Sequence, residues 1–148
     1  MTKEWGPPIW FFFHTLAEKI TNDGYLLLKD DICNIISSIC NCLPCPDCTK
    51  HAKQYTKYTL NSKILNTKEK LQMYLFKFHN DVNKRLHKPE FKDYDKYKSA
   101  NMRLIYQYFK GTYFKYNDPT RGFVQTMVRE RIIQRTDKFF IENHKYFN

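Results

Sequence analysis

Two cysteines separated by two residues, Cys45 and Cys48, have the clearest capacity for chemistry in this sequence. Pro46 suits the first turn of a helix, because its missing N–H would be unpaired there and its φ is already helical. Cys45 would then stand at or just before a helix N-terminus, where the helix dipole favours the thiolate that attacks disulfides. The motif predicts a redox-active dithiol, with a structural cysteine pair or half of a zinc site as alternatives.

Three further cysteines precede this pair. Cys42 lies three residues before Cys45 and forms an overlapping CxxC with it, so it either shuttles a disulfide or is a plain thiol. Cys33 and Cys40 are seven residues apart, on or near the apolar face of a predicted helix. A cysteine in such a position is usually a small core hydrophobe, and we interpret both in that way.

Length and composition favour one compact helical domain. The chain has 148 residues, 17% of them aromatic, with only four glycines and six prolines, which is unlike a turn-rich β sandwich. The formal charge of +10 would suit an acidic partner, but the lysines are scattered, which favours a generally basic surface over a nucleic-acid binder. We find no signal peptide and no membrane-spanning segment. We therefore expect a soluble protein made in a reducing compartment, where an exposed CxxC is usually catalytic or metal-binding.

The spacing of apolar residues predicts helices throughout the chain. An extended segment at residues 5–8 should lead into the first helix, and residues 22–24 should end it. Residues 60–67 are expected to form a loop, with Thr67 as a helix cap. A turn is expected at residues 117–119. The predicted helices cover residues 9–20, 29–41, the CxxC through Tyr55, 68–87, 100–113 and 123–140.

The segment at residues 68–87 has the clearest helical period. Its core stripe comprises Leu71, Leu75, Phe78, Val82 and Leu86. His79 and Asn83 lie beside this stripe, one turn apart. A histidine at a core edge is more often simply hydrogen-bonded, but the imidazole and amides of residues 79–83 could also bind the edge of a heteroaromatic ring.

The last predicted helix, at residues 123–140, has an apolar stripe and an opposite basic face. We expect the basic face to be solvated. The stripe comprises Val124, Met127, Val128 and Ile132, and the basic face comprises Arg129, Arg131 and Arg135.

Three segments, taken together, resemble the Erv/ALR family of FAD-linked sulfhydryl oxidases, and most closely its small members from large cytoplasmic DNA viruses. They are WGPPIWFFFH at residues 5–14, CPDCTKHA at residues 45–52 and FHNDVNKRLHKPEF at residues 78–91. Each segment alone is only suggestive, whereas their order and separation are specific. The resemblance covers about residues 5–91.

The resemblance implies an all-α fold of four bundled helices and a short fifth, in a domain at residues 1–98, followed by a helical extension of open role at residues 99–148. It also implies noncovalent FAD. By this likeness, Cys48 lies against the flavin and the exposed Cys45 exchanges with substrate. Trp10 and His14 would line the flavin. His51, His79 and Asn80 would surround the adenine, and Asn83, Lys84 and Lys88 would lie near the ribose and diphosphate. The implied cofactor-binding set is Gly6, Trp10, His14, Cys48, His51, Tyr55, Phe78, His79, Asn80, Val82, Asn83, Lys84, Leu86, Lys88 and Phe91.

The chain departs from the family pattern in two places. Pro7 stands where cellular members usually have a basic residue, and no cysteine follows Cys48, so the usual structural disulfide beyond Phe91 cannot form. Either packing alone holds the core, or Cys33, Cys40 and Cys42 pair differently.

The resemblance implies an enzyme, a thiol:oxygen oxidoreductase that forms disulfides in substrate proteins and reduces oxygen to hydrogen peroxide. The implied partners are thiol-bearing proteins, with a thioredoxin-like intermediary as one option, and a second copy in a homodimer. The expected locations are the host cytoplasm and the virion. One alternative is a zinc module of Cys42, Cys45, Cys48 and His51, whose ligands are unusually crowded. The other is a basic nucleic-acid binder with salt-dependent affinity.

Overall fold

The computed structural model of the chain describes residues 2–115 and 122–148. The only β pairing among these residues is an isolated bridge between Ile20 and Phe147, so the expected all-α class is confirmed. The short fifth helix expected in the domain at residues 1–98 corresponds to a single 3₁₀ turn, η1. The helices are α1 (Thr2–Lys19), α2 (Asn22–Cys40), α3 (Pro46–Thr56), α4 (Lys68–Arg85), η1 (Asp95–Tyr97), α5 (Met102–Lys115), α6 (Gly122–Asn143) and η3 (His144–Tyr146).

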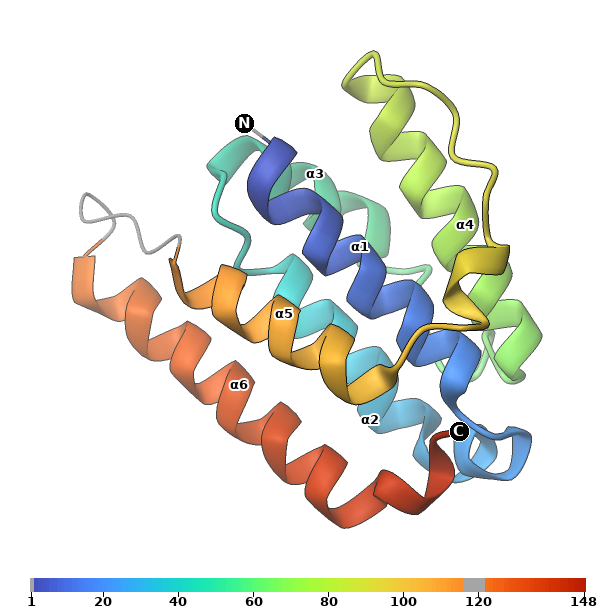
Figure 1. The fold of residues 1–148 in the computed structure, drawn as a ribbon. Helices are drawn as coiled ribbons and strands as arrows, with labels where there is room; N and C mark the ends of the chain where they lie inside the picture. Colours follow the sequence, from blue (N-terminus) through green and yellow to red (C-terminus); the bar gives the residue numbers. More distant parts are fainter. Residues whose placement is uncertain (1, 116–121) are drawn as a thin grey trace.

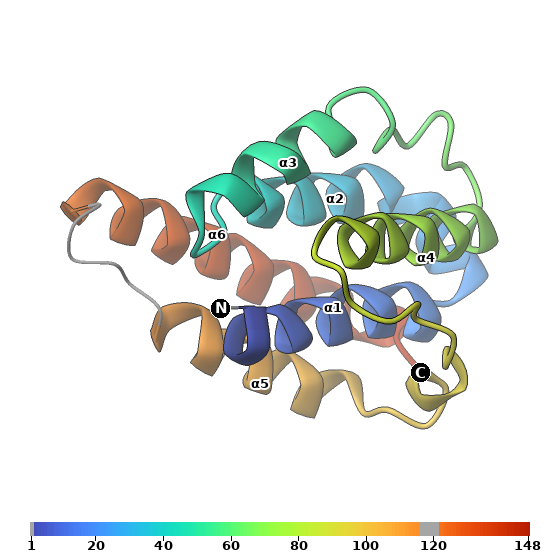
Figure 2. The same ribbon diagram turned by 90° about the horizontal axis from the view of Figure 1, so that it is seen from above.

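Helix α1 lies at the centre of the arrangement (Figure 1). It packs against α4 on one side and against α5 on the other, as the view from above also shows (Figure 2). Helix α2 contacts α3, α4 and α6. The helix that begins at the CxxC therefore rests on α2, and α1 and α4 lie close to it. In the part of the chain that the structure describes, no helix combines the length and apolar character needed to cross a membrane.

The start of the chain differs from the sequence prediction. Helix α1 already begins at Thr2, so residues 5–8 are helical and not extended. Trp5 and Ile9 are both buried, and their packing offsets the helix hydrogen bonds that Pro7 and Pro8 cannot donate. Proline chemistry suggested an extended segment, and tertiary packing overrode it.

Residues 22–24 also differ from the sequence prediction. They were expected only to end the first helix, but they form the first turn of α2. The Thr21 hydroxyl accepts a hydrogen bond from the Gly24 N–H at 3.0 Å and so caps α2. Gly24 is required there by close packing, since a Cβ at this position would lie 2.5 Å from Cβ of Tyr146. The predicted cap at Thr67 is confirmed, with its hydroxyl accepting from the Lys70 N–H at 3.2 Å.

The C-terminal helices share the core of the N-terminal ones. Phe12 of α1 stacks on Phe109 of α5 at a centroid distance of 4.6 Å, and Tyr106 packs beside this pair. Ile132 and Ile133 of α6 belong to the same buried cluster. The aromatic residues that suggested a helical protein therefore join α5 and α6 to the bundle, while the division at residue 98 stays a prediction.

The predicted faces of α6 were wrong in part. Arg129 is fully buried, whereas Met127 and Val128 are 37% and 36% exposed. The Arg129 guanidinium donates to the Leu43 carbonyl at 3.5 Å and lies over the Tyr113 ring, 5.7 Å from the centroid. These partners stand in the α2–α3 loop and on α5, which local periodicity cannot reveal. Arg131 and Arg135 are exposed as predicted. The side chain of Val124 and the turn predicted at residues 117–119 lie outside what the structure describes.

Replacing Tyr113 with phenylalanine is expected to lower the free energy of unfolding by about 1–2 kcal/mol. Its buried hydroxyl donates to the Cys42 carbonyl at 2.7 Å, and the change would leave that carbonyl without this donor. Urea denaturation checks the effect. Tyr108→Phe on the same helix is the matched control, because Tyr108 is 52% exposed; equal losses in the two variants would contradict the prediction.

Candidate functional site

The two cysteines of the CxxC lie at the start of α3, as predicted. Cys45 is the N-cap residue, and its sulfur accepts a hydrogen bond from the Cys48 N–H at 3.4 Å. Pro46 occupies the first turn. The Thr49 hydroxyl stabilises the segment that precedes the motif, because it accepts a hydrogen bond from the Leu43 N–H at 3.1 Å and donates one to the Cys45 carbonyl at 2.9 Å. The Cys45 sulfur therefore sits where the helix dipole favours negative charge. The expected exposure of Cys45 was wrong, however, because the residue is only 5% exposed and packs within the core.

A cavity of about 240 Å³ lies beside Cys48, enclosed mainly by α1, α3 and α4. Val82 and Leu86, predicted for the core stripe of α4, are only partly buried because they line this cavity. The cavity brings together most of the predicted cofactor-binding residues. Those that line it are Gly6, Trp10, Cys48, His51, Phe78, His79, Val82, Asn83, Leu86 and Lys88.

Planar side chains form one wall of the cavity. The rings of Trp10 and His79 are stacked with centroids 4.2 Å apart and an angle of 4° between their planes. Phe91 stacks on His79 at 4.5 Å but does not itself line the cavity. Behind this wall, the buried His14 shares a 2.9 Å hydrogen bond between its Nε2 and Nδ1 of His79. Flat faces of this kind suit a heteroaromatic ring.

Burial keeps both histidines neutral. Desolvation, followed by the nearby charges of Lys96 and Lys88, lowers the pKa of His79 to about 4. Desolvation and His79 itself hold the pKa of His14 well below its ordinary value. At neutral pH the pair therefore shares a hydrogen bond without carrying charge, and the cations at this site are lysines and arginine.

Two thiols line the cavity, and both resist ionisation. Burial, then the hydrogen bond and charge of Cys45, raise the pKa of Cys48 to about 11, while Arg85 opposes this rise. Burial alone raises the pKa of Cys40 to about 12. Only Cys48 has both a thiol partner and a cation, so Cys48 and not Cys40 is suited to redox exchange.

His51 contacts a carboxylate and not the cysteines. Its Nε2 lies 3.2 Å from a carboxylate oxygen of Asp81 on α4. Within the described ranges, no group of three or more histidine, cysteine, aspartate or glutamate side chains is arranged to hold a metal ion. The zinc alternative requires His51 to lie among Cys42, Cys45 and Cys48, and the described residues do not form such a cluster.

Comparison with known proteins agrees with this geometry. A family model described as the Erv1 / Alr family matches residues 7–102, and these include the CxxC and all the residues that line the cavity except Trp5 and Gly6. The chain belongs to this family. The expected resemblance is thereby confirmed.

The relatives that match the chain include two viral proteins and one fungal protein. The "Putative FAD-linked sulfhydryl oxidase 096R" of Invertebrate iridescent virus 3 is 33% identical over 88 residues, which cover 60% of this chain and 60% of that protein. The "FAD-linked sulfhydryl oxidase" of African swine fever virus (isolate Pig/Kenya/KEN-50/1950) is 37% identical over 84 residues, covering 57% and 69% respectively. The "Mitochondrial FAD-linked sulfhydryl oxidase erv1" of Schizosaccharomyces pombe is 27% identical over 88 residues, covering 60% and 48%. The match thus spans about half to two thirds of each relative, and no solved structure matches significantly.

Several residues predicted from the Erv1/Alr pattern do not line the cavity. Asn80 instead anchors the segment after α4, since its side chain accepts from the Phe91 N–H at 2.6 Å and donates to the Phe91 carbonyl at 3.1 Å. This anchoring holds Phe91 against His79. Tyr55 stacks on Phe78 at 4.5 Å and supports the wall from behind. Lys84 is exposed and does not line the cavity.

Sequence reasoning also missed residues at the cavity. Arg85, the last residue of α4, directly precedes Leu86 and lies close to Cys48. The sequence could have indicated this only if Arg85 had been assigned to the face of the helix that carries the other cavity residues. Lys96 lies over the rings of Phe91 and Tyr97, at 5.7 and 5.4 Å from their centroids. Both Lys96 and Tyr97 come from a segment without periodicity, so the sequence did not indicate that they would lie at the cavity. The other missed lining residues are Trp5, Pro7, Ile9, Phe11, Phe13, Cys40, Leu43 and Ala52.

The helices beyond the Erv1/Alr match hold the loop that carries the dithiol. In this loop, the Cys42 and Leu43 carbonyls accept from Tyr113 of α5 and Arg129 of α6, and the Cys42 thiol donates to Oε1 of Gln125 at 3.1 Å. All three contacts come from residues after position 102, where the family match ends. The extension therefore fixes the backbone just before Cys45.

Proposed function

We propose that this chain is an FAD-dependent thiol oxidase that forms disulfides in other proteins and reduces oxygen to hydrogen peroxide. The observation that carries the proposal is Cys48, which lines a cavity walled by flat aromatic side chains and contacts Cys45 at the helix terminus. Membership of the Erv1/Alr family and the names of the relatives support the same cofactor.

The residues of the cavity fit a flavin dinucleotide chemically. Trp10 and Phe78 offer apolar ring faces, and the amide of Asn83 offers a donor and an acceptor. Arg85, Lys88 and Lys96 supply the positive charge that a diphosphate needs. The enclosed space suits a single ring system, so the remainder of the dinucleotide would lie across these cationic residues. When bound, FAD would accept two electrons from a dithiol and pass them to oxygen.

The protein's own part is thiol–disulfide exchange. A substrate thiolate attacks the Cys45 sulfur of the Cys45–Cys48 disulfide, which releases Cys48 as the leaving thiolate and forms a mixed disulfide at Cys45. A second substrate thiolate attacks the substrate sulfur of that bond and releases Cys45. The substrate leaves as a disulfide, and Cys45 and Cys48 have gained its two electrons. Arg85 stabilises the released Cys48 thiolate, which burial would otherwise disfavour.

The purified chain is expected to be yellow and to consume oxygen when dithiothreitol is added. An absorbance spectrum identifies the flavin, and an oxygen electrode with a peroxide assay measures the turnover. One molecule of peroxide should form for each molecule of dithiothreitol oxidised, because each step transfers two electrons. Stoichiometric zinc without flavin absorbance would contradict the proposal.

We also propose a homodimer, protein substrates reached directly or through a thioredoxin-like intermediary, and activity in the host cytoplasm and the virion. The viral relatives support the location. Light scattering of the purified chain tests the dimer, and fractionation of infected cells and purified particles tests the location.

A further inference from the structure

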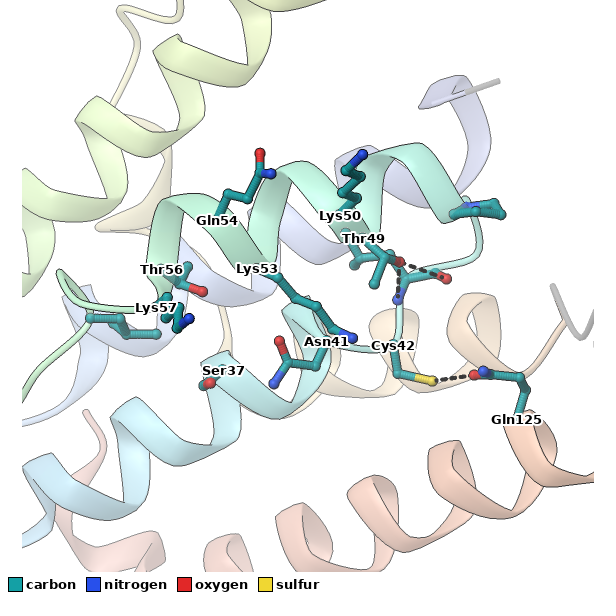
Figure 3. Close-up of a pocket in the computed structure, with 13 residues that line it drawn as sticks. Ser37, Asn41, Cys42, Thr49, Lys50, Lys53, Gln54, Thr56, Lys57 and Gln125 are labelled. Carbon is teal, nitrogen blue, oxygen red and sulfur yellow. Dashed lines mark hydrogen bonds between the residues drawn. The ribbon is translucent and has the colours of Figure 1, made fainter.

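A second hollow lies on the other side of the loop that precedes Cys45. It is a groove of about 870 Å³ between α3 and the end of α2, and Gln125 of α6 closes one end (Figure 3). Leu43 lines both this groove and the cavity beside Cys48, so the two hollows share a wall. The groove is also lined by Pro46, inside the CxxC motif, and by Thr49, directly after it.

The groove is cationic. Lys50, Lys53 and Lys57 line it from one face of α3, spaced by three and four residues, and no aspartate or glutamate lines it among the described residues. Figure 3 shows Lys53 reaching across the groove toward Asn41. None of the three ammonium groups forms an ion pair with a residue that the structure describes.

The remaining lining is suited to a peptide backbone. It includes the hydroxyl group of Ser37 and the amides of Asn41, Gln54 and Gln125, which supply donors and acceptors. From Lys50 to Lys57, α3 rises by roughly 10 Å, a distance that about three extended residues cover. The charge and the length together match a short acidic strand of another protein.

We propose that this groove binds an extended acidic segment of the substrate protein and thereby brings the neighbouring substrate thiol to Cys45. The inference rests on the proposed function and adds the substrate class: cysteines with aspartate or glutamate within about six residues. Pro46, the residue directly after Cys45, lines the groove, so a segment held by the lysines lies next to the motif, although the Cys45 sulfur itself is buried.

Three synthetic peptides test the proposal. Each carries the same pair of cysteines, flanked by glutamates, by serines or by lysines, and kcat/KM is measured by oxygen consumption. We expect the acidic peptide to exceed the neutral one by about tenfold at low salt, and the basic peptide to be the poorest. Raising NaCl from about 20 to about 300 mM should remove most of this difference, because exposed charges are screened.

Charge reversal in the groove provides the second measurement. The variant Lys53→Glu/Lys57→Glu is expected to lose the preference for the acidic peptide while it oxidises dithiothreitol at the original rate. Lys77→Glu/Arg103→Glu makes the same change in net charge at exposed positions outside the groove, and it should keep the preference. Circular dichroism of both variants confirms that they are folded.

Two results would overturn the proposal. One is equal kcat/KM for the three peptides in a protein that oxidises dithiothreitol well. The other is tight binding of a fluorescent single-stranded oligonucleotide that the groove variant abolishes, without any advantage for the acidic peptide, since that would make the groove a nucleic-acid surface. Failure to oxidise dithiothreitol, in contrast, would refute the proposed oxidase function itself.

Discussion

Cys48→Ser is expected to lower thiol-dependent oxygen consumption by about 10³-fold or more while the protein stays yellow. Serine keeps the size and position of the side chain, so the walls of the cavity are retained and the flavin should remain bound. A hydroxyl cannot form a disulfide with Cys45, however, and it cannot carry the electron pair that a thiolate carries. Flavin absorbance and oxygen uptake with dithiothreitol, measured on the same sample, check both halves of the expectation.

Cys33→Ala is the control for this experiment. Cys33 lies on α2, outside the residues that line the cavity, and burial raises its pKa to about 11. Its loss should leave turnover nearly unchanged. The overlapping pair of Cys42 and Cys45 gives the experiment a second use. If Cys48→Ser kept high turnover and then lost it when Cys42 was also changed to serine, Cys42 would be the exchanging partner and the assignment to Cys48 would be wrong.

Acid is expected to destabilise the fold strongly, because His14 and His79 are held neutral in it. The pKa of each is lower in the folded than in the unfolded chain, where it is near 6.5, so the unfolded chain binds more protons as the pH falls. Stability from this pair is therefore complete above pH 6.5 and is lost below it, down to pH 4 for His79. At about pH 4.5 the loss from His79 alone should be about 2–3 kcal/mol, and His14 changes stability in the same direction.

Urea denaturation at a series of pH values measures this loss, with flavin absorbance recorded alongside to separate cofactor release from unfolding. His79→Gln should reduce the dependence on pH, since one of the two groups is removed. His144→Gln is the control, because His144 is exposed at the end of the chain. An unchanged pH profile in the His79 variant would show that other groups cause the acid sensitivity.

The sequence was most informative where function depends on short local patterns. The position of Cys45 as a helix cap followed from Pro46 alone, and α4 was predictable because its apolar residues repeat without interruption. Most of the residues now found around the cavity came from motifs and not from periodicity. Those motifs identified Trp10, His79 and Asn83 even though they do not specify how these residues meet.

The errors arose where tertiary contacts override local preference. The helical pattern predicts a solvent-exposed Arg129, because charged residues on a surface helix usually face the solvent. Arg129 is instead buried against the carbonyl of Leu43, which lies in a loop 86 residues earlier in the chain. Pro7 and Pro8 suggested an extended segment, and burial of Trp5 made it helical. Lys96 and Tyr97 reach the cavity from a segment with no regular pattern, so only the folded structure brings them there.

The bracing of the Cys42–Leu43 backbone by Tyr113 and Arg129 sets an order of events during synthesis. The sulfurs leave the ribosome long before the side chains that steady them. A nascent chain that has emerged only to residue 100 carries both thiols without this brace. The loop before the dithiol therefore gains both contacts only after α5 and α6 have docked, so its final geometry depends on residues that are synthesised after the family match ends.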